Sequence, residues 1–304
     1  MAVRDRLPRP APRSGVLEID APVSEEDLRR LVGCRWVAEL VVEGSLPAPA
    51  LDGVVRAGRQ AGRRVRVLGG LPEGELPVVP AGERWRYDAF GHRPGWLLVG
   101  RAPSRWQVAI KRAADIIVAG IAAVALSPVL VATAIAVYLS SPGPILYAWR
   151  VVGRNGRPFT GYKFRTMIQN ADALKPGLLE RNEMVGPVFK VGDDPRLTGV
   201  GGWLRRYSLD ELPQLWNVVR GEMSLVGPRP PLREEYERFE LWQMRKLSVT
   251  PGLTCLWQVK GRNAIRDFAD WARLDLQYID RWSLWLDFRI LVQTIPAVIG
   301  GTGH

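Results

Sequence analysis

One apolar segment, residues 115–144, "DIIVAGIAAVALSPVLVATAIAVYLSSPGP", restricts the fold of this chain more than any other. Positions 116–139 carry no charge over about 24 residues, which is long enough to cross a bilayer as one helix. Ser127 and Pro128 stand in its middle, however, and proline inside a helix costs about 3 kcal/mol unless the helix bends there. Each half then measures roughly 16 Å, about half of a hydrocarbon core.

Basic residues flank this segment on both sides. They are Arg105, Lys111 and Arg112 before it and Arg150, Arg154 and Arg157 after it. The positive-inside rule places both ends on the cytoplasmic side, which a single straight span does not allow. We therefore predict a re-entrant membrane helix hairpin over residues 108–140 that enters the membrane, breaks at Ser127-Pro128 and returns. A plain span and a buried helix are the alternatives.

The part of the chain before this hairpin predicts a small accessory unit. Residues 1–14 are basic and lack the apolar core of a signal peptide, so we expect a disordered tail. Within residues 15–100, "WVAELVVEG" and "RRVRVLGG" predict buried strands, and "ALDGVVRAGRQAG" predicts a helix between them. This is the order of a parallel β-α-β unit, which we interpret as a partial Rossmann-like domain. It has no glycine-rich phosphate loop, so we assign it no cofactor.

The rest of the chain contains no second segment long enough to span a membrane. The C-terminal "SLWLDFRILVQTIPAVIGG" is interrupted by Asp287 and Arg289, and Trp282 and Trp285 stand at its start. This pattern predicts a helix lying in the membrane interface. We therefore expect an α/β protein in which residues 101–304 form a membrane-associated domain, with a mostly helical cytosolic catalytic part over residues 141–304.

Composition narrows the chemistry. The net charge of +11 and the pI of about 10.2 favour an anionic partner, which leaves nucleic acid, a phosphorylated substrate or an anionic membrane surface. The two histidines are His92 and the terminal His304, so a Ser-His or Cys-His mechanism is not expected. Cys34 and Cys255 do not make a disulfide framework or a zinc site. Catalysis would therefore rely on carboxylates, arginines and lysines.

The segment "RRYSLDELPQL" sets two acids, Asp210 and Glu211, side by side. Ser208 and Glu211 have the spacing of a capping box, and acids are stabilised at a helix start, so an ordinary first turn is one interpretation. Arg205 precedes the acids, and Arg229 is held between two prolines shortly after them. Arginines of this kind favour phosphate recognition. An ionised acid beside them can attack phosphorus or hold Mg²⁺, which predicts phosphoryl transfer through an aspartyl intermediate.

Several ordered motifs now identify a resemblance. They are "KR..D", the Ser-Pro break, "SPGPILY", "RVVGRNGRPFTGYKFRTM", "DDPRLTGVGGWLRRYSLDELPQLWNV", "GEMSLVGPRPPL" and "PGLTCLWQVKGRN". Over residues 108–299 the chain resembles the bacterial sugar transferases, also called monotopic phosphoglycosyl transferases. The resemblance implies transfer of a sugar-1-phosphate from a UDP-sugar to a polyprenol phosphate such as undecaprenyl phosphate, with release of UMP. This reaction starts the assembly of an exopolysaccharide, capsule or O-antigen.

The resemblance also implies roles for individual residues. Asp210 matches the nucleophile and a ligand of the Mg²⁺ cofactor, and Glu211 matches its catalytic partner. Matching positions for substrate or phosphate binding are Arg205, Arg229, Lys163 and Arg165, and Arg262 in "KGRN" is a further candidate. The implied location is the cytoplasmic face of the bacterial inner membrane, with monotopic attachment. Trp149 and Thr250 depart from the pattern, because members often carry glutamine and a basic residue there.

Other interpretations stay open at this point. Weaker candidates for metal or substrate contacts are Asp193 and Asp194 in a predicted turn, Asn263 in a loop, and Asp275 and Asp280 on a predicted helix. A catalytically inactive membrane scaffold or regulator with the same fold is the main alternative function. A nucleic-acid-binding protein is disfavoured, because no binding motif accompanies the charge. The identity of the sugar is open, with a lean to glucose or galactose, and a partial α/β unit is consistent with a homo-oligomer.

Overall fold

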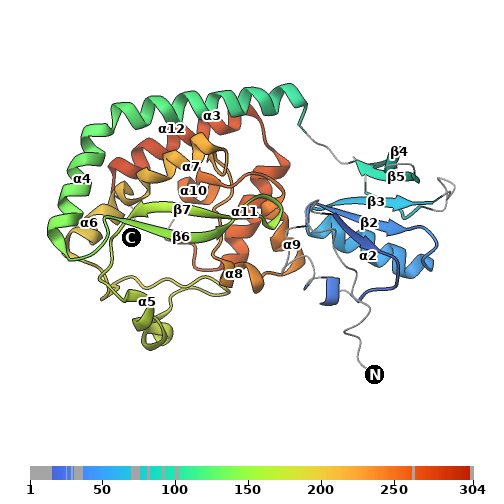
Figure 1. Cartoon of the computed structure of the whole chain (residues 1–304), viewed down its shortest axis with the longest axis horizontal. Helices are drawn as coiled ribbons and strands as arrows, with labels where there is room; N and C mark the ends of the chain where they lie inside the picture. Colours follow the sequence, from blue (N-terminus) through green and yellow to red (C-terminus); the bar gives the residue numbers. More distant parts are fainter. Residues whose placement is uncertain are drawn as a thin grey trace. The chain divides into compact units, whose positions relative to one another are not determined.

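The computed structural model describes residues 16–24, 26–28, 30, 37–69, 76–80, 83–90, 93–99, 103–261 and 264–301. The described chain is a mixed α/β protein that divides into two compact units (Figure 1). The first unit is built from Met1–Pro103 together with Arg154–Arg157 and Glu237–Ser248. The second is built from Ser104–Gly153, Pro158–Tyr236 and Val249–His304.

The first unit contains the predicted strand-helix-strand pattern. Strands β2 (Glu39–Glu43) and β3 (Arg64–Leu68) pair in parallel, and α2 (Ala48–Gln60) connects them. Strand β1 (Val16–Ile19) adds a further parallel neighbour to β2. Strands β5 (Arg93–Val99) and β4 (Arg84–Phe90) complete the sheet in the order β1-β2-β3-β5-β4, and both of their pairings are antiparallel.

The antiparallel pair β4–β5 is absent from the sequence-based prediction, so the sheet is mixed. The relation of this unit to a Rossmann-like domain stays a prediction. In the first unit, α9 (Leu241–Met244) and the 3₁₀ helices η3 (Arg154–Gly156) and η6 (Arg245–Ser248) are contributed by later parts of the chain.

The second unit begins with the apolar segment, which forms two helices. Helix α3 spans Arg105–Ala125 and α4 spans Ser127–Ser140. They meet at Leu126 at a bend of 62°, and Pro128 lies in the first turn of α4, where it breaks no hydrogen bond within the helix (Figure 1). Within the described chain, neither helix is by itself long and apolar enough to cross a bilayer, whereas the bent pair together meets that requirement.

Two small sheets and a set of short helices make up the rest of the second unit. Strands β6 (Leu146–Val152) and β7 (Pro158–Phe164) pair antiparallel, and β8 (Ser224–Val226) pairs in parallel with β9 (Gly252–Thr254). The helical elements are α5 (Ala171–Leu174), η4 (Pro176–Arg181), α6 (Gly199–Arg206), η5 (Leu209–Gln214), α7 (Leu215–Arg220), α8 (Arg233–Glu237), α10 (Leu256–Lys260), α11 (Phe268–Asp280) and α12 (Leu284–Ile299).

An apolar core joins α3 to the helices that follow the acid pair. Its buried members include Ala119 of α3, Val218 of α7, Tyr278 of α11 and Ile290 of α12. All four are less than 4% exposed. Burying this much apolar surface is the main force that holds the helices of the second unit together.

Polar contacts fix α3 in the same position. Lys111 Nζ donates to Asp287 Oδ2 of α12 at 2.6 Å and to the Val226 carbonyl at the end of β8 at 3.1 Å. The hydroxyl of Tyr278 and the indole N–H of Trp282 also donate to Asp287, at 2.7 and 3.2 Å. Three donors therefore stabilise one largely buried carboxylate, and Lys111 is the cation that balances its charge.

The neighbouring residue, Arg112, closes the C-terminal end of α7. Its guanidinium donates to the carbonyls of Val218 and Val219 at 2.6 and 2.7 Å. These carbonyls lie in the last turn of α7, where a cation also interacts favourably with the helix dipole. Gly221 follows with φ of 84°, a left-handed conformation that ends the helix. Helix α3 is thus tied to the element that comes directly after the two acids.

Candidate active site

The acid pair lies on η5, a 3₁₀ helix that leads straight into α7. The carboxyl group of Asp210 is buried, with 6% of the residue exposed, while Glu211 is partly exposed. The prediction of a capping box at Ser208 is wrong. This residue has φ of 56°, and its side chain accepts no capping hydrogen bond. The chain instead makes a left-handed turn between α6 and η5, which a sequence pattern for α-helix starts does not predict.

Three basic side chains from different elements lie around this pair. Lys163 projects from β7, and burial lowers its pKa while Glu211 and Asp210 act in the opposite direction. Arg229 and Arg205 lie close enough to lower that pKa further. Burial also lowers the pKa of Arg205, and Asp210 opposes that effect. The structure therefore brings together five predicted site residues, two acids and three cations, within electrostatic reach of one another.

Burial raises the pKa of Asp210 to about 6, and the adjacent Glu211 adds to that increase. Lys163 and Arg205 lower it in turn, but without cancelling the cost of removing the charge from water. The buried carboxylate of Asp210 and the adjacent carboxylate of Glu211 repel each other, so the pair favours a ligand that brings positive charge or a proton. A perturbed pKa of this size beside a specific set of charges is typical of functional sites.

The loop that carries Arg229 is held by strands on both sides. Gly252 N donates to the Pro228 carbonyl at 2.9 Å, and Val152 N of β6 donates to the Pro231 carbonyl at 2.9 Å. Gly252 faces Gly227 so closely that a Cβ on Gly252 would lie 2.0 Å from the Gly227 nitrogen. The two glycines therefore allow β8 and β9 to approach, and the Pro-Arg-Pro turn is positioned before any ligand binds.

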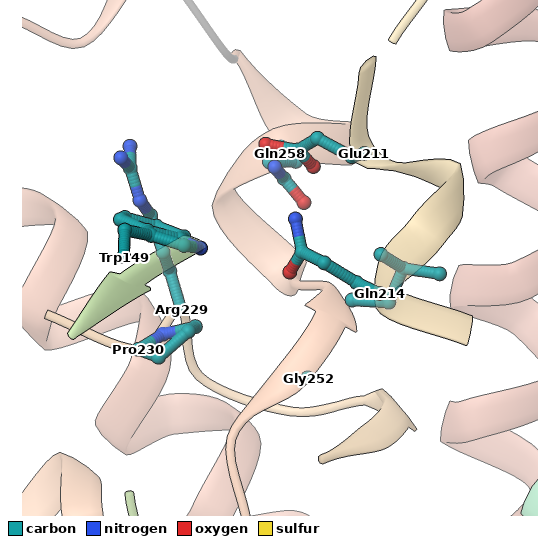
Figure 2. A pocket seen from close by; sticks show the side chains of 8 residues that line it. Trp149, Glu211, Gln214, Arg229, Pro230, Gly252 and Gln258 are labelled. Atoms are coloured by element: carbon teal, nitrogen blue, oxygen red, sulfur yellow. The ribbon is translucent and has the colours of Figure 1, made fainter. Parts of the chain in front are cut away.

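A small pocket opens between this loop and Glu211 (Figure 2). Its lining includes Trp149, Glu211, Gln214, Arg229, Gly252 and Gln258. Neither Gln214 nor Gln258 was predicted from the sequence to have a role. The position of Gln214, one helical turn after Glu211 in "DELPQL", is the signal that could have identified it.

Asn217 holds the strand of Lys163 against the helix that follows the acids. Its side chain is fully buried and donates to the Thr160 carbonyl at 2.7 Å and to Glu222 Oε2 at 2.8 Å. Its Oδ1 accepts from Tyr162 N at 3.3 Å. The bonds to Thr160 and Tyr162 connect β7 with α7, so the position of Lys163 relative to the acids depends on this amide.

Replacing Asn217 with alanine is expected to leave the Thr160 carbonyl and the Tyr162 amide without these partners inside the protein. We expect a loss of about 2–4 kcal/mol in the free energy of unfolding, because unmet buried groups cost more than a hydrogen bond gains. Thermal unfolding of the full chain in detergent measures the change. Asn217→Asp keeps the acceptor for Tyr162 but sets a carboxylate against the Thr160 carbonyl and Glu222, so it should lose at least as much. Equal stability of Asn217→Ala and wild type would contradict the role of this amide.

The remaining candidates that the structure describes have other contacts, although Asp194 also lies within electrostatic reach of Arg205. The guanidinium of Arg165 donates to the carbonyls of Pro142 and Ser141, which follow α4, so these bonds support a loop. Asp194 is buried in a pair with Arg196 at 2.6 Å, which lowers its pKa and matches the turn interpretation. Arg262 and Asn263 lie outside the described residues. Asp275 is fully buried on α11, and Asp280 ends that helix.

The geometry first defines the kind of site: a buried aspartate beside a partly exposed glutamate, with three basic side chains around them, in a unit that also contains a bent apolar helix pair. The family of bacterial sugar transferases matches residues 106–301, more than half of the chain. The chain belongs to this family, and the resemblance stated from the motifs over residues 108–299 is confirmed.

Individual relatives agree with this assignment. The chain is 50% identical over 161 residues to galactosyl transferase CpsE of Streptococcus agalactiae serotype III, which covers 53% of this chain and 36% of CpsE. It is 43% identical over 192 residues to exopolysaccharide production protein ExoY of Sinorhizobium fredii, covering 62% of this chain and 84% of ExoY. It is 42% identical over 165 residues to undecaprenyl-phosphate galactose phosphotransferase of Salmonella typhimurium, covering 53% of this chain and 34% of that protein. The chain thus spans about a third of two of these relatives.

Proposed function

We propose that this protein transfers a sugar-1-phosphate from a UDP-sugar to a polyprenol phosphate, as the first step of polysaccharide assembly on a lipid carrier. The single observation that carries the proposal is the buried Asp210, adjacent to Glu211 and within the field of Lys163, Arg205 and Arg229. The reactions named for the relatives, transfer of galactose or glucose phosphate to undecaprenyl phosphate, support the same chemistry.

The proposed reaction has two displacements at phosphorus. A carboxylate oxygen of Asp210 attacks the phosphorus that bears the sugar, and the bond from that phosphorus to the oxygen shared with UMP breaks. UMP leaves with the electron pair of this bond. A phosphate oxygen of the lipid then attacks the same phosphorus, and the bond to Asp210 breaks, which regenerates the carboxylate. Two steps of this kind let the donor and the lipid occupy the site in turn.

The surrounding side chains suit this charge distribution. Both substrates carry phosphate charges that would repel a carboxylate, and Lys163, Arg205 and Arg229 offset that repulsion by electrostatic attraction. Arg205 donates from Nε to Thr166 Oγ1 at 3.0 Å, which leaves its terminal nitrogens for a ligand. Glu211 would act as the partner of Asp210 by holding a proton or a cation.

The two carboxylates also fit a magnesium ion. In the described part of the chain no group of three or more His, Cys, Asp or Glu side chains is arranged for a metal. Mg²⁺ commonly uses only one or two carboxylates and completes its shell with water and substrate phosphates. Asp210 and Glu211 would hold it, and the repulsion that raises the pKa of Asp210 would be relieved. When bound, such an ion supplies charge neutralisation at the diphosphate.

The proposal includes attachment to the cytoplasmic face of the bacterial inner membrane through a re-entrant α3–α4 pair. Large apolar side chains on α3, α4 and α12 are exposed. Among them are Ile117, Ile121, Val124, Val131, Ile135, Leu139, Trp285, Phe288 and Ile295. Exposed apolar surface of this extent favours a lipid environment, where a lipid phosphate can reach the site laterally.

The test is release of UMP by the purified full chain in detergent, with Mg²⁺, undecaprenyl phosphate and a panel of UDP-sugars. We expect release from one UDP-sugar that depends on the lipid and is lost in Asp210→Asn. Asp270→Asn is the matched control, because this exposed acid pairs with Arg273 on the surface of α11. Release that survives Asp210→Asn would remove Asp210 as nucleophile. Absence of release from every donor would favour the scaffold interpretation.

A further inference from the structure

The pocket beside the acids has an uncharged side that the proposed mechanism does not use. Gln214 is 3% exposed, and its side chain makes no hydrogen bond to any residue that the structure describes. Trp149 is 8% exposed, and its indole Nε1–H has no partner among the described residues either. A buried N–H such as that of Trp149 is normally hydrogen-bonded, so this donor and the unpaired amide of Gln214 at the same pocket call for a ligand.

The arrangement of these side chains defines what the ligand has to offer. Figure 2 shows the amide of Gln214 pointing into the space between Trp149 and Gln258. Gln258 already accepts from Cys255 N at 3.1 Å through its Oε1, which leaves its amide nitrogen as the group available to the pocket. The free space is about 10 Å³, which suits one water-sized polar group.

The uncharged side favours a hydroxyl over a phosphate oxygen. An amide both donates and accepts, and an indole N–H only donates. A phosphate oxygen accepts only, so it is better served by Lys163 and Arg229 on the charged side. A hydroxyl group matches these side chains, because its oxygen can accept from the Trp149 N–H and it can donate to, or accept from, the amide of Gln214.

The position of Trp149 is enforced by its neighbours. It lies opposite Gly161 in the β6–β7 pair, and a Cβ on Gly161 would fall 2.4 Å from the indole Nε1. The ammonium of Lys163 lies over the same ring, 3.9 Å from its centroid. The uncharged side therefore connects directly to the lysine of the acid site.

We propose that Gln214 and Trp149 are specificity-determining residues that bind a hydroxyl group of the sugar nucleotide. This inference rests on the proposed function and deepens it. The hydroxyl belongs either to the hexose or to the ribose of the donor, and the choice of ligands in the test separates the two.

The test uses the full chain in detergent with Gln214→Met, which keeps the length of the side chain and removes its polar atoms, and with Trp149→Phe. We expect kcat/KM for the preferred UDP-hexose to fall about 10- to 100-fold in Gln214→Met. For a hexose hydroxyl the preference between UDP-glucose and UDP-galactose should also narrow, whereas for a ribose hydroxyl both donors should lose equally. Inhibition by inorganic pyrophosphate should stay within twofold of wild type. Unchanged inhibition by UMP identifies the hexose, and weakened inhibition by UMP identifies the ribose.

A third variant tests the same geometry by another route. Gly161→Ala places a methyl group against the indole and should lower kcat/KM in the same direction as Trp149→Phe, with lipid-dependent activity retained. Wild-type kcat/KM in all three variants would overturn the inference and leave the proposed function intact. Inhibition by pyrophosphate that weakens by the same factor as kcat/KM for the UDP-hexose would overturn the inference as well, because the side chains would then contact phosphate. A wild-type protein inactive with every donor would overturn both.

Discussion

Asp210→Asn is expected to raise the stability of the protein while it lowers lipid-dependent UMP release by at least about a thousandfold. The loss of activity follows because an amide does not replace a carboxylate as nucleophile. The gain in stability follows because burial and Glu211 raise the pKa of Asp210 from its ordinary 3.8 to about 6. At pH 8 without magnesium the folded protein therefore holds a charge that the unfolded chain accommodates more easily, and we expect a gain of about 1–3 kcal/mol.

The dependence of this gain on pH has a definite sign. The folded state binds the proton of Asp210 more tightly than the unfolded chain does, so this contribution to stability is complete below pH 3.8 and is lost as pH rises through about 6. The advantage of Asp210→Asn in thermal unfolding should accordingly be largest at pH 8 and smaller at pH 5. Added Mg²⁺ should stabilise wild type more than the variant.

A neighbouring acid provides the opposite control. Arg196 lowers the pKa of Asp194 through a buried hydrogen-bonded pair, so Asp194→Asn is expected to lose stability at pH 8. A lower unfolding temperature for Asp210→Asn than for wild type at pH 8 would mean that the basic side chains compensate the buried charge in full.

Lys111→Met is expected to lower the free energy of unfolding by about 2–4 kcal/mol. The change removes the cation from Asp287 and leaves a largely buried carboxylate with neutral donors only, from Tyr278 and Trp282. Thermal unfolding in detergent should show a decrease of roughly 5–10 °C. The methionine fills nearly the same volume, so the loss reports on charge and not on packing.

A double variant separates charge from other effects. Asp287→Asn removes the unbalanced charge but keeps an oxygen that can accept from Tyr278, so Lys111→Met with Asp287→Asn should recover at least half of the lost stability. Arg105→Met serves as a surface control at the start of α3 and should change little. Additive losses in the double variant would show that the pair does not act as a unit.

The sequence predicted those structural features that depend on neighbouring residues in the chain. The apolar run with its Ser-Pro break predicted two helices, and the observed break at Leu126 lies one residue before it. The order of strand, helix and strand between residues 37 and 68 predicted a parallel pair that is present. The adjacency of Asp210 and Glu211 needs no tertiary contact to be visible, so the chain alone marks them as a candidate pair.

Features that depend on tertiary contacts were not predictable in this way. The proximity of Lys163 and Arg229 to the acids was implied only by the family resemblance, because β7 and the Pro-Arg-Pro turn meet through packing and not through sequence spacing. The left-handed turn at Ser208 replaced a predicted cap. A single glutamine in a helical segment does not indicate a binding site, so Gln214 was not predicted. Its role becomes visible only when Trp149 and Gln258 are known to line the same pocket.

The tie between α3 and α7 has a consequence for the meeting of enzyme and lipid. Arg112 of α3 is hydrogen-bonded to the C-terminal end of α7, and α7 begins directly after η5. The distance between the acid pair and the surface on which α3 lies is therefore fixed. A lipid carrier presents its phosphate at the level of the headgroups and nowhere else. In the proposed setting, the depth of α3 in the membrane therefore determines whether Asp210 lies at the same level as the lipid phosphorus that it has to reach.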